Sequence, residues 1–121
     1  MICTGILYWI SNKLYLQWTI WWIDIILHLF GGLFVCFIFF GIYSLFFDLK
    51  LIHRTKLLFI ALLSTFAIGT LWEVYELNSG ITSLSSSIYY FDTSKDLLMD
   101  LVGGIVGFVY TSNFLKKLNN K

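Results

Sequence analysis

The chain has 121 residues, of which 59% are hydrophobic and only 12% are charged, and it contains no proline. A soluble domain of this size needs many more charged side chains to cover its surface, so the composition excludes that class. A formal net charge of +1 without a basic stripe gives no sign of nucleic acid as a partner. We therefore predict an all-α, polytopic integral membrane protein, folded as a single transmembrane domain over residues 1–121.

Residues 1–19 precede the long apolar runs and differ from them in composition. Their apolar stretch, residues 6–10, is too short to cross a bilayer, and aromatic side chains and Lys13 lie around it. We interpret this N-terminal segment as an interfacial amphipathic or re-entrant lead-in. An irregular fourth span is the alternative interpretation.

Three later segments are long and apolar enough to be transmembrane helices. They cover, approximately, residues 20–47, 57–77 and 96–115. Residues 78–90 are rich in serine and predict a loop outside the hydrocarbon. Asp92 or Thr93 is then expected to cap the N-terminus of the third helix.

Positive charge indicates how the chain is oriented in the bilayer. Most basic residues fall in the connection between the first two spans and in the C-terminal tail: Lys50, Arg54, Lys56, Lys116, Lys117 and Lys121. By the positive-inside rule both segments are cytoplasmic, so the first and third spans start at the non-cytoplasmic face.

The acidic residues gather at that non-cytoplasmic face. Six of the seven carboxylates are placed there, namely Asp24, Glu73, Glu76, Asp92, Asp96 and Asp100. His28 lies one helical turn after Asp24, and the two acids of each later span are three or four residues apart. This spacing puts the polar groups of each span on one helix face.

Energetics favour helices that turn these faces toward one another. A carboxylate at a helix centre in lipid costs about 2.5–3.5 kcal/mol on insertion scales, so such groups face the bundle or water. A cluster of this kind predicts a divalent metal ion as cofactor. The expected ligands are Asp24, His28, Glu73, Glu76, Asp96 and Asp100. A proton-sharing acid cluster and simple solvation of acids near helix ends are the alternatives.

The first and third spans contain the same short pattern. Residues 24–32 and 96–104 both read D-[IL]-[IL]-[LM]-[HD]-L-x-G-G. If the two helices are pseudo-equivalent about an axis near the membrane normal, Asp24 lies opposite Asp96 and His28 lies opposite Asp100. Gly103 and the glycine four residues later also form a GxxxG pair, which permits close helix approach.

The ordered motifs resemble a known group of membrane proteins. They read Asp24-x-x-x-His28, Trp72-Glu73-x-x-Glu76 and Asp92-Thr93-x-x-Asp96-x-x-x-Asp100-x-x-Gly103. This order resembles the YjdF-like family of uncharacterised bacterial membrane proteins and, more loosely, the VanZ-like family linked to glycopeptide resistance. In VanZ-like proteins an asparagine is usual where Asp100 stands, which favours the YjdF-like resemblance. The resemblance implies a multi-pass protein of the bacterial plasma membrane and brings no established reaction.

Three functional hypotheses remain open. The first is a metal-dependent site that acts on a lipid or cell-envelope substrate, with Glu73, His28 and Asp96 as catalytic residues and Glu73 or His28 as general base. The second is proton- or cation-coupled binding or transport, which requires a homo-oligomer because three helices make a poor pathway alone. The third is a structural subunit, surrounded by membrane lipids, whose acids stabilise its fold or dock a partner.

Overall fold

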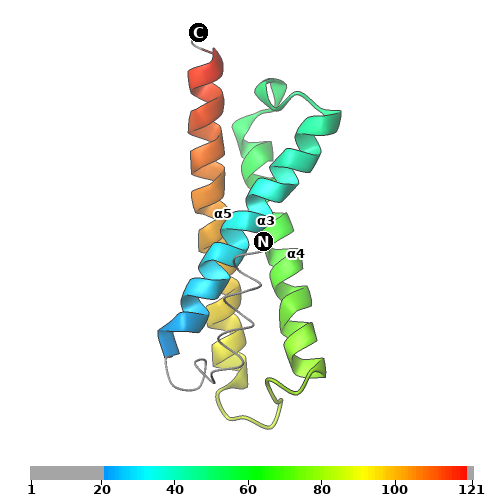
Figure 1. The fold of residues 1–121 in the computed structure, drawn as a ribbon, viewed down its shortest axis with the longest axis vertical. Helices are drawn as coiled ribbons and strands as arrows, with labels where there is room; N and C mark the ends of the chain where they lie inside the picture. Colours follow the sequence, from blue (N-terminus) through cyan, green and yellow to red (C-terminus); the bar gives the residue numbers. More distant parts are fainter. Residues whose placement is uncertain (1–20, 120–121) are drawn as a thin grey trace.

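The computed structural model describes residues 21–119, and every regular element in that range is a helix. Three long helices follow one another along the chain, with one short 3-10 helix between the first two (Figure 1). They are α3 (Trp21–Phe46), η1 (Leu49–Leu51), α4 (Arg54–Asn78) and α5 (Tyr89–Asn119). Our interpretation of residues 1–19 lies outside the described residues.

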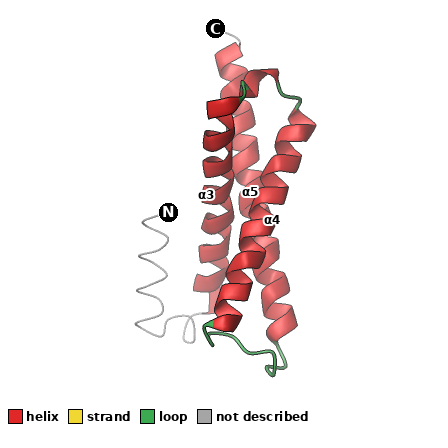
Figure 2. Ribbon diagram, turned by 90° about the vertical axis from the view of Figure 1, so that its right-hand side faces the viewer, coloured by secondary structure: helices red, strands yellow, loops and turns green. Residues whose placement is uncertain are grey.

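The three long helices confirm the predicted all-α, polytopic membrane architecture. Each contains a segment long and apolar enough to cross a membrane: Trp22–Phe46, Arg54–Asn78 and Tyr89–Lys117. A helix of 25 residues is about 38 Å long, which exceeds a hydrocarbon core of about 30 Å. The connecting segments lie at the two ends of the bundle (Figure 2).

The third helix begins seven residues before the predicted start of its span, so the predicted N-cap at Asp92 or Thr93 is wrong. The backbone N–H of Asp92 already donates to the carbonyl of Ile88 at 2.9 Å, inside a helical turn. Its carboxylate accepts a hydrogen bond from the Lys95 ammonium at 2.6 Å instead of capping the helix. The charged partner one turn later therefore explains why this acid lies within α5.

α3 and α5 run in the same direction, and α4 runs antiparallel to both (Figure 1). The parallel pair packs with its backbones in contact, because glycines stand at the crossing. A Cβ on Gly32 would overlap the backbone of Asp100, and a Cβ on Gly103 would overlap the carbonyl of Leu29. A Cβ on Gly107 would lie 2.9 Å from Sγ of Cys36. The GxxxG pair of α5 therefore packs on α3 within one chain.

The distribution of polar groups is inverted relative to a soluble bundle. The buried apolar core is small and consists of Cys36, Phe40, Leu57 and Ala61. Large apolar side chains cover the outside, among them Phe59 at 65% exposure and Leu71 at 63%. A protein with acids inside and apolar side chains outside buries its polar groups away from lipid, as a membrane bundle must.

Backbone geometry defines the two ends of α4. At its start, His53 is the N-cap, and its ring Nδ1 accepts from the N–H of Thr55 at 3.4 Å. At its end, Gly80 adopts a left-handed conformation with φ of 71°. The N–H of Ile81 donates to the carbonyl of Glu76 at 3.0 Å, and that of Gly80 to Leu77 at 3.3 Å. These bonds form a Schellman motif, which ends α4 at Asn78, two residues after Glu76.

Candidate metal centre

The polar residues predicted from the three helix faces meet at one end of the bundle, where α3 and α5 begin and α4 ends. We call this the acidic end. Five of the six predicted ligands are buried there, with exposures of 3–6%: His28, Glu73, Glu76, Asp96 and Asp100. The sixth, Asp24, has a side chain that is 22% exposed. Each helix contributes at least one buried carboxylate or imidazole, so the site depends on all three.

His28 lies at the centre of this group. Its Nδ1 atom is 3.2 Å from Oδ2 of Asp100 on α5. Its Nε2 atom is 3.8 Å from Oδ1 of Asp24 and 3.9 Å from Oε1 of Glu73. The imidazole therefore has carboxylates from all three helices around it. The contact also confirms the prediction, made from the pattern shared by the first and third spans, that His28 lies opposite Asp100.

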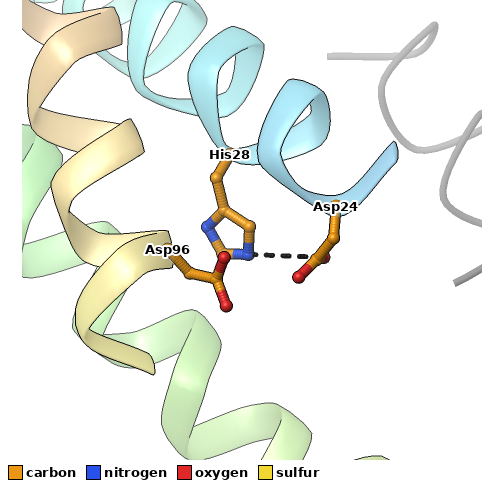
Figure 3. A group of neighbouring side chains, drawn as sticks. All are labelled: Asp24, His28 and Asp96. Atoms are coloured by element: carbon orange, nitrogen blue, oxygen red, sulfur yellow. Dashed lines mark ion pairs between the residues drawn. The ribbon is translucent and has the colours of Figure 1, made fainter. Parts of the chain in front are cut away.

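Three of the predicted ligands form a compact set. One ligand atom from each of Asp24, His28 and Asp96 lies within 4.8 Å of the other two. Figure 3 shows the three side chains pointing toward one another, two from α3 and one from α5. The predicted proximity of Asp24 and Asp96 is confirmed by this set. One imidazole nitrogen with two carboxylates is a donor combination that fits a divalent metal ion.

Glu73 borders this set and has one oxygen without a hydrogen-bond partner. Oε2 accepts from the Thr93 hydroxyl at 2.8 Å, whereas Oε1 is buried and has no hydrogen-bond donor. That oxygen is the one 3.9 Å from Nε2 of His28. Oδ1 of Asp96 is also buried without a hydrogen bond. Buried carboxylate oxygens without hydrogen bonds are costly, so both atoms are left with an unmet need for a donor or a cation.

Two of the six predicted ligands have other partners. Asp100 contacts the far nitrogen of the His28 ring, so it orients the imidazole from behind. Glu76 accepts a hydrogen bond from the indole Nε1 of Trp72 at 3.1 Å. Neither residue belongs to the compact set of Asp24, His28 and Asp96.

Glycine makes room for the Asp100 carboxylate. A Cβ on Gly69 of α4 would overlap Oδ2 of Asp100 and lie 3.2 Å from Leu97. A Cβ on Gly31 of α3 would lie 3.5 Å from the other carboxylate oxygen. Gly69 lies one helical turn before Glu73, and its missing side chain leaves room for an acid from another helix.

The comparison with protein-family models matches almost the whole chain. The family described as "Predicted membrane protein (DUF2238)" matches residues 1–117. The chain belongs to this family. Its description agrees with the three membrane-spanning helices of the structure. No curated protein and no solved structure matches the chain.

One residue of this DUF2238 member enters the site without having been predicted there. The Lys95 ammonium lies 2.6 Å from Asp92, 3.5 Å from Asp96 and 3.9 Å from Asp24. The pattern of charge along the chain places Lys95 on the side of the acids but does not predict which of them it contacts. The sequence feature that could have indicated this contact is the position of Lys95, three residues after Asp92 and directly before Asp96.

Proposed function

We propose that the acidic end binds a divalent metal ion through Asp24, His28 and Asp96. The observation that supports this most directly is the compact set of their ligand atoms, within 4.8 Å of one another, beside a buried Glu73 oxygen without a donor. A bound cation would offset the repulsion among these carboxylates and would coordinate the buried Oδ1 atom of Asp96, which has no hydrogen bond. The donor set of one nitrogen and carboxylate oxygens suits zinc, manganese or iron better than calcium.

The proposed ion serves a reaction on a lipid or cell-envelope substrate. A divalent ion in such a site acts as a Lewis acid and lowers the pKa of a bound water molecule. Glu73 is the proposed general base, because its Oε1 atom faces the centre of the site and Thr93 holds its other oxygen. Asp100 has a positioning role, since it fixes the ring of the ligand His28.

The proposed location is the bacterial plasma membrane, with the acidic end at the non-cytoplasmic face. The support comes from charge: the start of α4 and the end of α5 lie together at the opposite end, with Arg54, Lys56, Lys116 and Lys117. The resemblance to YjdF-like and VanZ-like proteins agrees with this location. The acidic end of the bundle is then on the side of the membrane on which cell-envelope substrates are found.

A structural role is the second candidate, and one observation favours it. His28 has carboxylate neighbours on α3, α4 and α5, so the cluster also ties the three helices together. If this were its whole purpose, Glu73→Gln and Asp96→Asn would reduce expression and assembly. The metal hypothesis predicts instead that Glu73→Gln folds normally.

Elemental analysis of the protein purified in detergent tests the proposal. We expect about one equivalent of a divalent metal in the wild type and in Glu73→Gln, and its loss in His28→Ala and Asp96→Asn. Asp48→Asn is the matched acid-to-amide control, because Asp48 is exposed at the opposite end of the bundle. Absence of every common divalent metal, before and after reloading, would overturn the proposal.

A further inference from the structure

Lys95 of α5 is surrounded by carboxylates. Its ammonium lies 3.5 Å from Oδ1 of Asp96 and 3.9 Å from Oδ2 of Asp24, and these two residues are proposed metal ligands. It lies closest, at 2.6 Å, to Oδ1 of Asp92, which is outside the compact ligand set. One positive charge is thus shared between two ligands of the site and one acid beside it.

No other basic residue of the described chain can replace it. Within residues 21–119, all remaining lysine and arginine residues lie in the connection between α3 and α4, in the first turn of α4 or near the C-terminal end of α5. These places are at the opposite end of the bundle (Figure 1). The buried oxygen Oδ1 of Asp96, which has no hydrogen bond, has the Lys95 ammonium as its cationic neighbour.

We propose that Lys95 is a built-in counter-ion that competes with the metal for Asp24 and Asp96. This inference rests on the proposed metal function. Without metal, the ammonium offsets part of the negative charge of the two carboxylates and stabilises the packing of α3 against α5. A divalent ion and an ammonium repel each other at this range, so metal binding moves Lys95 away from Asp24 and Asp96 while it keeps its contact with Asp92. Lys95 thereby lowers the metal affinity, and Asp92 holds the displaced ammonium.

The first test is a zinc and manganese titration of four purified variants by calorimetry. Lys95→Met is expected to bind at least about fivefold more tightly than the wild type, which is the lower end of the usual coupling between two sites. Lys95→Arg keeps the charge and is expected to stay close to the wild type. Asp92→Asn is expected to bind more weakly, because the displaced ammonium loses its partner. Lys117→Met, on the same helix at the opposite end, is the control and is expected to leave the affinity unchanged.

The second test needs no metal. In chelator, Lys95→Met is expected to melt at a lower temperature than Lys117→Met, because Asp24, Asp92 and Asp96 lose their shared counter-ion. Removing one of these charges as well, in the double variant Asp24→Asn/Lys95→Met, is expected to recover part of the loss. Added zinc is expected to raise the melting temperature of Lys95→Met more than that of the wild type.

The outcomes separate this inference from the proposed function. Metal binding by the wild type with no gain in Lys95→Met overturns the role of Lys95 and leaves the metal site standing. Metal binding by Lys95→Met alone supports the competition. If neither protein binds metal, both the metal function and the competition are overturned. Equal melting temperatures of Lys95→Met and Lys117→Met in chelator overturn the counter-ion role by themselves.

Discussion

Nδ1 of His28 and Oδ2 of Asp100 lie 3.2 Å apart, although 72 residues separate them in the chain. Both residues are buried, at 6% and 5% exposure. When a carboxylate accepts from one ring nitrogen, the other nitrogen is fixed as the acceptor that can bind a metal. The contact therefore sets the ring so that Nε2 faces Asp24 and Glu73.

Removing this carboxylate is expected to weaken metal binding without removing a ligand. We predict that Asp100→Ala lowers the affinity about 10- to 100-fold, the usual cost of losing the partner of a metal-bound histidine. Asp100→Asn keeps an acceptor oxygen and is expected to lose less. Calorimetric titration of both variants checks the order, with Asp48→Asn as control. Unchanged affinity in Asp100→Ala would show that the ring is held by other contacts.

The glycine beside that carboxylate gives a second prediction. Gly69→Ala places a methyl group where Oδ2 of Asp100 lies, so the helices must separate or the carboxylate must rotate. We expect a loss of about 1–3 kcal/mol in the free energy of unfolding in mixed micelles, the range for an overpacked interior.

Gly41→Ala is the control for this substitution. A Cβ at Gly41 meets nothing within 4 Å, so alanine there is expected to be neutral or to stabilise α3 by up to about 1 kcal/mol. Equal effects of the two substitutions would mean that the cost lies in the helix backbone and not in the Asp100 contact.

The sequence predicted the architecture well because apolar length is a strong signal. Long apolar runs identified the three spans, and the repeated pattern placed His28 opposite Asp100, which the 3.2 Å contact confirms. The start of α5 was missed because residues 89–91 are aromatic and polar residues follow them, so hydropathy alone placed the span later.

The other features of the site that the sequence did not predict are contacts between side chains of different helices. The hydroxyl of Thr93 donates to Glu73 across two helices, and no periodicity within one helix encodes that pair. Lys95 likewise reaches Asp24 on another helix. Such details depend on the rotation of each helix about its axis, which the apolar outer faces determine only coarsely.

Thr93 gives a third prediction, since its hydroxyl is the hydrogen-bond donor to Glu73, at 2.8 Å. Thr93→Val keeps the shape of the side chain and removes the donor, which leaves both oxygens of a buried carboxylate without hydrogen bonds. We expect a loss of about 1–3 kcal/mol in the free energy of unfolding, the penalty for an unsatisfied buried group.

Thr70→Val is the matched control for that substitution. The hydroxyl of Thr70 bonds only the carbonyl of Phe66 on its own helix, at an exposed position. Its replacement is expected to change stability by less than about 0.5 kcal/mol, as is usual for surface substitutions. A Thr93→Val protein as stable as Thr70→Val would show that Glu73 does not need the donor.

The turn after α4 provides a fourth prediction. Gly80 has a φ of 71°, a conformation that costs an L-residue with a side chain about 1–2 kcal/mol. Gly80→Ala is therefore expected to lower the melting temperature, and Gly80→Asn, which tolerates this region, is expected to lower it less. Hydrogen exchange at Ile81, whose N–H closes the motif, measures the local effect. Equal protection of the Ile81 N–H in the wild type, Gly80→Ala and Gly80→Asn would show that the turn does not depend on glycine at position 80.

The concentration of acids on α5 has a consequence for biogenesis. Asp92, Asp96 and Asp100 all lie on this one helix, and a single aspartate near a helix centre already disfavours insertion by about 2.5–3.5 kcal/mol. His28 on α3 contacts Asp100, and Gly69 on α4 leaves room for its carboxylate, so both lie on helices synthesised before α5. If the helices enter the bilayer in chain order, α3 and α4 already present a polar face when α5 inserts, and its acids can pack against that face instead of lipid. The order of the helices along the chain is therefore compatible with the order of insertion.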